Sequence, residues 1–340
     1  MKKVIFYLII LLIIAGLGAS AWFIFGILTP VKITAQSDFT IITGDGVHQI
    51  SYNLKQKNII RNQFIFETYV FLKDVGSNFR AGDYSLPEVI NIKRLVDLLT
   101  SGEAADNPEI LVKEGDTIDD IDGSLAGQGQ FKAGDFLSAL KGLNQDFLSD
   151  REFLTDKPAT ARLEGYLFPD TYSFFSYSSA SDLIRKMLNN FDAKLTDDLR
   201  LEIKKQGKTI FDIITMASIV EKEVKIDQTN PGPDGHVVAG IFWKRLSAGM
   251  PLQSDATIKY EIKRTPTAAD LKIDSPYNTY LYQGLPPGPI CNPGLAAIKA
   301  AIYPVESDYW FFLTELNKQG TVHYAKDFQE HEANIAKYLK

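Results

Sequence analysis

The 340-residue sequence contains very little cysteine and histidine. Its one cysteine, Cys291, cannot form a disulfide bond within the chain, so a hydrophobic core has to hold the fold together. Cys291 also lies far from the N-terminus, which excludes a lipoprotein anchor at this residue. As a nucleophile it would need a histidine partner, and the sequence has only His48, His236, His323 and His331. We therefore interpret Cys291 as a packed or loop residue.

The sequence also lacks an excess of basic residues. It has 36 Lys and Arg against 42 Asp and Glu, a formal net charge of −6 and an isoelectric point near 5.4. A nucleic-acid-binding protein usually has a basic face, so we expect no nucleic acid as a partner. With 45% hydrophobic and 23% charged residues, the composition is that of a globular protein. The length allows roughly two domains.

Charge is absent altogether from residues 4–28, a run that follows Lys2 and Lys3. As a helix, its 25 residues at a rise of about 1.5 Å each would extend about 37 Å, enough to cross a hydrocarbon core of about 30 Å. A buried core helix would be shorter and would carry a polar stripe. We therefore predict a single-pass transmembrane helix. The two lysines place residues 1–3 in the cytoplasm and residues 30–340 outside it.

A removed signal peptide is the alternative interpretation of this run. Residues 19–21, Ala-Ser-Ala, have the small-x-small form of a cleavage site. A signal peptide turns polar after its cleavage site, whereas this run stays apolar through residues 22–28. We therefore expect the segment to be retained and to anchor the chain in the inner (cytoplasmic) membrane.

Residues 37–104 have the pattern of a small α+β module. Its expected strands and helices lie, in chain order, at 39–42, 47–59, 64–72, 81–86 and 92–99. This order resembles the LysM-like module, a small glycan-binding fold. A spacer domain without glycan binding would show the same pattern, because fold alone does not determine function.

The most informative later segment is 210–223. Its apolar residues cover too much of the helix circumference for a surface helix, so we predict a buried helix. Glu221 follows Ala217 by four residues and Ile214 by seven, which places its carboxyl on the same face. Apolar surroundings disfavour the charged form of a carboxyl and raise its pKa, as a general acid near neutral pH requires.

The pattern alone leaves two alternatives to this interpretation of Glu221. The helix could simply reach solvent at 221–223, because acidic residues are seldom buried without a partner. Glu223 could also be the acid, since it follows Ile219 by four residues and Met216 by seven. The proline- and tyrosine-rich run at 250–289 suits the binding of sugar rings, although ordinary loop packing explains the same composition.

Three segments together resemble the endolytic murein transglycosylase (YceG-like) family of bacterial cell-wall enzymes. They are Glu-Gly-Tyr-Leu-Phe-Pro-Asp-Thr-Tyr at 164–172, Ala-Ser-Ile-Val-Glu-Lys-Glu at 217–223, and Tyr-Asn-Thr-Tyr with Gly-Leu-Pro-Pro-Gly within 277–288. The resemblance covers almost the whole chain. It identifies the first acid of the Ile-Val-Glu-Lys-Glu motif, Glu221, as the catalytic residue and so decides between Glu221 and Glu223.

The resemblance implies an α+β fold made of the transmembrane helix at 4–28, the LysM-like module at 37–104 and a mixed α/β catalytic domain at 108–340. It implies no metal ion and no organic cofactor. We expect the glycan to contact five motif residues: Glu164, Tyr166, Gln253, Asp255 and Asn278.

The implied reaction is that of a lytic transglycosylase, which needs a single acid and no water. Glu221 would protonate the oxygen between N-acetylmuramic acid and N-acetylglucosamine, then accept the proton of the muramic C6 hydroxyl as that oxygen bonds to C1. The product is a 1,6-anhydro end, which would terminate elongation of a nascent strand. Peptidoglycan strands and cell-wall synthases are the expected partners. The alternative function is a membrane-tethered glycan-binding scaffold without catalysis.

Overall fold

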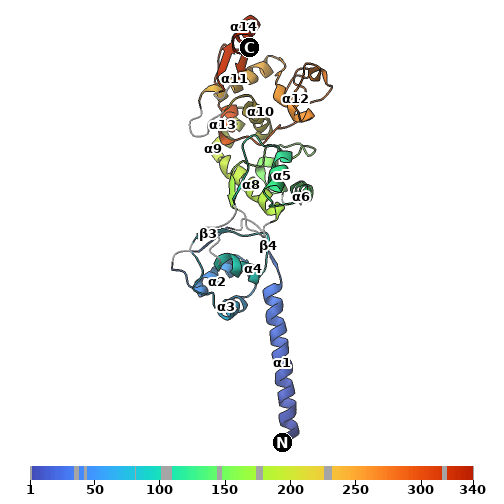
Figure 1. Ribbon diagram of the computed structural model, residues 1–340. Helices are drawn as coiled ribbons and strands as arrows, with labels where there is room; N and C mark the ends of the chain where they lie inside the picture. The colour runs from blue at the N-terminus through green and yellow to red at the C-terminus, as the bar shows by residue number, and fades with distance from the viewer. Residues whose placement is uncertain are drawn as a thin grey trace. The chain divides into compact units, whose positions relative to one another are not determined.

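The computed structural model describes residues 2–33, 38–41, 44–80, 82–100, 109–143, 148–173, 179–225, 232–315 and 320–339 (Figure 1). The chain forms two compact units, one of residues 1–108 with 173–178 and one of residues 109–172 with 179–340. The structure is rich in helices, and each described sheet has two strands. The predicted mixture of helices and strands is confirmed. The expected boundary at 104–108 lies outside the described residues.

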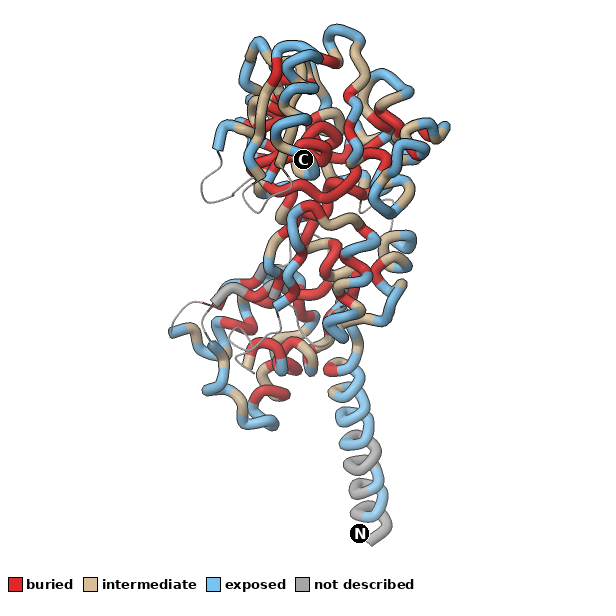
Figure 2. Tube along the Cα trace, turned by 45° about the horizontal axis from the view of Figure 1, so that its top comes forward, coloured by how far each residue is buried: buried red, intermediate tan, exposed pale blue. Residues whose placement is uncertain are grey.

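The first helix, α1, extends from Lys2 to Leu28 (Figure 1). Its C-terminal end packs on α3 (Gln63–Leu72): Ile27 is buried, and a Cβ on Gly26 would lie 2.4 Å from Cδ1 of Ile65. Toward its other end, the described residues of α1 are exposed (Figure 2). Within the ranges given above, no helix is both long enough and apolar enough to cross a membrane.

The N-terminal unit contains two antiparallel strand pairs beside short helices. The pairs are β1 (Val31–Lys32) with β4 (Val89–Ile90) and β2 (Asp38–Ile41) with β3 (Gly82–Ser85). Besides α1 and α3, the helices are α2 (Val47–Gln56) and α4 (Ile92–Thr100). The predicted strands near 39–42 and 81–86 and the predicted helix at 92–99 are confirmed as β2, β3 and α4.

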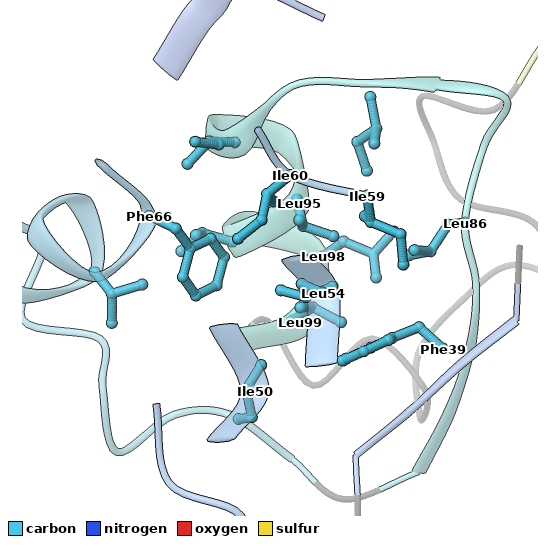
Figure 3. Packing of buried hydrophobic residues seen from close by; sticks show 14 of the residues in the cluster. Phe39, Ile50, Leu54, Ile59, Ile60, Phe66, Leu86, Leu95, Leu98 and Leu99 are labelled. Carbon is cyan, nitrogen blue, oxygen red and sulfur yellow. The ribbon is translucent and has the colours of Figure 1, made fainter. Parts of the chain in front are cut away.

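One apolar core holds this unit together. Helix side chains such as Leu54, Phe66 and Leu95 converge with Phe39 of β2, and all four are at most 1% exposed (Figure 3). Burial of this kind is the main favourable contribution to folding, which a chain without disulfide bonds requires. The apolar residues of the predicted strands and helices therefore form this core.

The C-terminal unit carries the three motifs. Its strands are β5 (Glu109–Leu111), β6 (Thr171–Ser173), β7 (Phe311–Thr314) and β8 (Val322–Ala325), paired β5 with β6 and β7 with β8. Its α-helices are α5 (Ile118–Gly127), α6 (Asp135–Lys141), α8 (Ala180–Lys194), α9 (Asp197–Lys205), α10 (Ile210–Glu223), α11 (Asp234–Ser247), α12 (Asp255–Ile262), α13 (Leu295–Ile302) and α14 (Phe328–Tyr338). Short 3₁₀ turns lie at Glu152–Leu154 and Asp270–Lys272.

Helix α10 is the centre of this unit, packed against α11, α12 and α13. It begins with a reciprocal capping box, in which the Thr209 hydroxyl accepts from the Asp212 N–H and the Asp212 carboxylate accepts from the Thr209 N–H. Every residue from 213 to 220 is buried, on all sides of the helix. The predicted buried helix is confirmed. Because residues 213–220 are packed on all sides, they fix the position of the C-terminal end of α10, where the acidic motif lies.

Candidate active site

A cleft of about 900 Å³ opens beside the C-terminal end of α10. Its walls come from five parts of the unit: the end of α10, α11, the 252–255 loop, strand β7 and the start of α14. Both acids of the motif, Glu221 and Glu223, line it, together with aromatic side chains from three of these walls. This size lies toward the upper end of the range for ligand pockets, roughly 300–1,000 Å³.

Glu221 lies in the last turn of α10 and faces the start of α13. Its Oε2 accepts a hydrogen bond of 3.1 Å from the backbone N–H of Gly294, the N-cap residue of α13. Burial raises the pKa of Glu221 to about 7, and the charge of Glu114 adds to the rise, while the Gly294 N–H and Lys222 oppose it. A carboxyl with this pKa exists in both protonation states near neutral pH, as an acid that must also act as a base requires.

Glu223 lies in the same cleft with a similar pKa but a different set of partners. Burial raises the pKa of Glu223 to about 7, the Ser254 hydroxyl opposes the rise, and the charge of Asp255 adds to it. The Ser254 hydroxyl donates to Oε1 of Glu223, and Ser254 is itself fixed by the Thr279 hydroxyl, which accepts from its N–H at 3.0 Å. Glu223 therefore ties the end of α10 to the 252–255 loop.

Glu164 is a third acid with a raised pKa, but it lies in the interior and does not line the cleft. Its carboxylate accepts from the Ile118 N–H at 2.9 Å, from Nδ2 of Asn292 at 3.1 Å and from the Tyr260 hydroxyl at 3.2 Å. Burial raises the pKa of Glu164 to about 7, against these hydrogen bonds and nearby cations. In this position Glu164 joins three segments of the unit.

The other predicted glycan-contacting residues divide between the cleft and the interior. Gln253 and Asp255 line the cleft, and Gln253 has a positive φ of 56°, an unusual conformation for a residue other than glycine. Tyr166 is fully buried between the rings of Phe153 and Phe191. Asn278 is also buried.

The Asn278 amide donates to the carbonyls of Leu271 and Ile273, so it stabilises the turn that leads to the cleft. Glu164, Tyr166 and Asn278 do not line the cleft. They would influence glycan binding only by fixing the positions of the residues that do. Gly165, between the two buried motif residues, has a φ of +89°, and a Cβ there would lie 2.6 Å from Ile214 of α10. The first motif is therefore a packing element for α10.

Asn292 is a central residue of the site that the sequence motifs did not include. Its Oδ1 accepts from the N–H groups of Gly165 and Leu167 at 2.9 and 3.0 Å. Its Nδ2 donates to the Asp116 carbonyl at 3.0 Å and to Glu164. Because Gly294 follows two residues later, this amide fixes the segment whose N–H contacts Glu221. Its position between Cys291 and Pro293, next to a sequence motif, was the available signal.

Arg245 was also absent from the sequence-based candidates, although it joins two walls of the cleft. It is 5% exposed, and its Nε and Nη1 donate to the carbonyls of Trp310 and Leu252, each at 2.8 Å. The guanidinium carbon lies 4.9 Å from the ring centre of Phe311. These contacts fix strand β7 relative to the 252–255 loop.

Cys291 is buried, and its sulfur lies 3.3 Å from the Ser218 carbonyl. Burial raises the pKa of its thiol well above the ordinary value, which disfavours the nucleophilic thiolate. The interpretation of Cys291 as a packed residue is confirmed. In the described part of the chain, no group of three or more His, Cys, Asp or Glu residues is placed to hold a metal ion.

Comparisons with known proteins agree on one family. The YceG-like family matches residues 39–337. A protein of Bacillus subtilis named endolytic murein transglycosylase is 33% identical over 334 residues, covering 93% of this chain and 90% of that protein. Two Streptococcus pneumoniae proteins of the same name are 30% identical over 367 residues and cover 98% of this chain. The chain spans 65% of the length of each pneumococcal protein.

A solved structure supports the same relationship. The crystal structure of a YceG-like protein from Listeria monocytogenes matches 88% of this chain and 99% of its own, with a TM-score of 0.58 and 32% sequence identity. At this identity and coverage, the structural similarity extends over both units of the chain rather than over a single motif.

Proposed function

The chain belongs to the YceG-like family, and from this membership and the cleft we propose that it is an endolytic lytic transglycosylase with Glu221 as its catalytic acid. It cleaves the bond between N-acetylmuramic acid and N-acetylglucosamine in glycan strands of peptidoglycan. The observation that carries the assignment is the position of Glu221, a residue of the cleft lining whose carboxyl has a pKa of about 7 and accepts a hydrogen bond from the Gly294 N–H.

The reaction needs one carboxyl that first donates and then accepts a proton. Protonated Glu221 transfers its proton to the glycosidic oxygen as the bond to C1 breaks, and the leaving sugar departs as an alcohol. The resulting carboxylate takes the proton of the C6 hydroxyl while that oxygen bonds to C1, which closes the 1,6-anhydro ring and restores the acid. Ordinary glycosidases need a second carboxyl to activate water or to attack the sugar, and this cycle does not.

The surroundings of Glu221 support both halves of the cycle. Burial favours the protonated acid before the first transfer. After the transfer, the Gly294 N–H at the start of α13 donates to the carboxylate, where the helix dipole also favours negative charge. Glu223, the other motif acid in the cleft lining, accepts hydrogen bonds from two donors, the Ser254 hydroxyl and the Ala256 N–H, whereas Glu221 accepts from the Gly294 N–H. This difference favours Glu221 as the proton donor.

We also propose the membrane arrangement that the sequence predicts. Residues 4–28 would form a retained single-pass anchor in the cytoplasmic membrane, with residues 1–3 inside and the catalytic unit outside. The uncharged run that follows Lys2 and Lys3 in the sequence supports this arrangement. The module at 37–104 would act as a LysM-like glycan-binding element, and cell-wall synthases would be the partners that supply nascent strands. A tethered scaffold without catalysis is not favoured.

Digestion of purified murein tests the catalytic proposal directly. The full-length protein in detergent is incubated with murein, and the products are analysed by mass spectrometry for 1,6-anhydromuramic ends. Glu221→Gln is the test variant and Glu306→Gln, at an exposed carboxyl outside the cleft, is the matched control. Anhydro ends from the wild type and the control but not from Glu221→Gln support the proposal. Reducing ends produced by hydrolysis would contradict it.

A further inference from the structure

The aromatic wall of the cleft contains a side chain whose exposure the fold does not explain. Phe328, the first residue of α14, is 59% exposed and lines the cleft that contains Glu221. The Asp327 carboxylate caps the helix by accepting from the Glu330 N–H at 2.8 Å, which fixes the turn that carries Phe328. An exposed aromatic ring on a fixed helix end is available to a ligand in the cleft.

Two further rings support Phe328 from the same wall. Phe311 of β7 meets it edge to face, with ring centres 5.9 Å apart and planes at 61°. His331, one turn along α14, stacks on Phe311 at 5.4 Å and 23°. The Arg245 guanidinium also lies over the Phe311 ring. Its hydrogen bonds to the carbonyls of Trp310 and Leu252 connect two walls of the cleft. The ring of Phe328 is therefore backed by a packed cluster rather than carried on a mobile side chain.

The three rings of this wall, those of Phe328, Phe311 and His331, present no charge that would select an ion. Burial, together with the charge of Arg245, lowers the pKa of His331, so the imidazole is neutral near neutral pH. The Arg245 guanidinium is 5% exposed and engaged with backbone carbonyls. This wall of the cleft therefore offers a ligand an apolar ring face. Polar side chains such as Glu315 and Gln253 lie elsewhere on the cleft lining.

An apolar face with polar groups around it matches the chemistry of a pyranose, which has a C–H face and hydroxyl groups at its edge. We propose that Phe328, supported by Phe311 and His331, forms a sugar-binding subsite in which its ring stacks on one pyranose of the glycan strand. The proposal rests on the proposed function, because the occupant is the strand that Glu221 cleaves. It assigns to α14 a role in substrate affinity that none of the sequence motifs covers.

The subsite is tested by binding and by kinetics. Binding is measured with the uncleaving Glu221→Gln full-length protein in detergent and peptide-free glycan strands as the probe. Adding Phe328→Ala should raise Kd roughly threefold to tenfold, the range of a single aromatic contact, and Phe328→Tyr should restore it. In the cleaving enzyme, Phe328→Ala should raise KM by a similar factor with kcat nearly unchanged. Ile335→Ala, on the same helix but outside the cleft lining, is the matched control.

Fluorescence gives a readout that a purely structural role would not produce. Phe328→Trp should change its emission when glycan is added, beyond the change of the parent protein, whereas Ile335→Trp should not. Unchanged Kd and KM for a folded Phe328→Ala would overturn the subsite while leaving the proposed function intact. If the substitution weakens binding of free stem peptide but not of peptide-free strands, the ring binds peptide and the proposal is wrong. If the wild type neither binds nor cleaves murein, both proposals fail.

Discussion

The backbone N–H of Gly294 donates to Oε2 of Glu221 at 3.1 Å, across 73 residues of sequence. This bond connects the C-terminal end of α10 to the N-terminal end of α13, so the candidate acid is held where two buried helices meet. Burial raises the pKa of Glu221, and the hydrogen bond from the Gly294 N–H opposes this rise. The outcome, a pKa of about 7, suits a group that gives and regains a proton in one catalytic cycle.

Glu221→Gln should abolish cleavage and leave the fold intact. The amide is nearly isosteric with the carboxyl but has no acidic proton to give, so the leaving sugar would depart unassisted. General acid catalysis contributes a factor of about 10²–10⁴, and the loss should lie at the upper end because one group serves as acid and base. The rate of anhydro-end formation measures the effect, and circular dichroism checks the fold. Near-normal product formation would exclude Glu221 as the acid.

Glu223→Gln should retain cleavage within a few-fold of the wild type. The amide oxygen can still accept from the Ser254 hydroxyl, so the link between α10 and the 252–255 loop is kept. The fall in activity as the pH rises through about 7 should persist in this variant, because that loss of activity reflects the pKa of Glu221. The measurement is a pH–rate profile of the wild type and of Glu223→Gln. If Glu223→Gln removes the alkaline fall and the activity, the two roles are reversed.

Glu164 should make the folded protein less stable as the pH rises. Its pKa is about 7 in the folded state, against about 4.3 in an unfolded chain, so between these values only the folded state holds the proton. The free energy of unfolding should therefore fall between about pH 4.3 and 7, by up to roughly 4 kcal/mol for this group.

Glu164→Gln should remove that part of the pH dependence, because the amide does not ionise. Urea unfolding at pH 5 and pH 8 gives the comparison, with Glu306→Gln as an exposed control. The variant should lose less stability than the wild type between the two pH values. An identical difference in both proteins would mean that Glu164 is not held at a raised pKa.

Asn292→Ala should lower both stability and kcat. It leaves the N–H groups of Gly165 and Leu167 without this acceptor, at about 1–3 kcal/mol for each buried group that stays unsatisfied. The displaced segment also carries the Gly294 N–H that contacts Glu221. Thermal unfolding and single-turnover cleavage measure the two effects. The control is Asn334→Ala, which removes one hydrogen bond, from the Asn334 amide on α14 to the Tyr324 carbonyl. It should lower the midpoint temperature of unfolding far less than Asn292→Ala does.

The proposed anchor predicts that the N-terminal segment stays on the protein. The apolar run continues past residues 19–21, so signal peptidase should not separate it. Mass spectrometry of the N-terminal peptide from native membranes should find residues 4–28 attached to the rest of the chain. A mature N-terminus at Trp22 would show that the segment is a signal peptide.

The elements that local sequence determines were predicted well. Helix α10 was predicted at 210–223 because its apolar residues cover most of the helix circumference, and every residue from 213 to 220 is buried. The strands β2 and β3 and helix α4 likewise follow local patterns of apolar residues and turn residues. These predictions succeed because side-chain periodicity and helix capping depend on residues within a few positions of each other.

Local sequence patterns could not predict which polar motif residues lie in the cleft and which are buried. Glu164 and Asn278 occur in motifs that suggest substrate contact, yet both are buried. Glu164 accepts from the backbone of a distant segment, and Asn278 donates to carbonyls of its own turn. Gln253 and Asp255 belong to a similar motif and do line the cleft. A buried, hydrogen-bonded polar residue and an exposed ligand contact have the same sequence signature, since both need a polar side chain in a fixed loop.

Glu221 and Glu223 show most clearly what the sequence determines and what only the tertiary structure determines. Both follow apolar residues of α10 at spacings of four and seven, so periodicity cannot separate them, and burial raises the pKa of each to about 7. Only tertiary structure gives them different partners, the Gly294 N–H for one and the Ser254 hydroxyl for the other, 73 and 31 residues away. The sequence of α10 determines that two acids end a buried helix. Packing of distant segments around that end determines which hydrogen-bond donors each acid meets: the start of α13 for Glu221 and the 252–255 loop for Glu223.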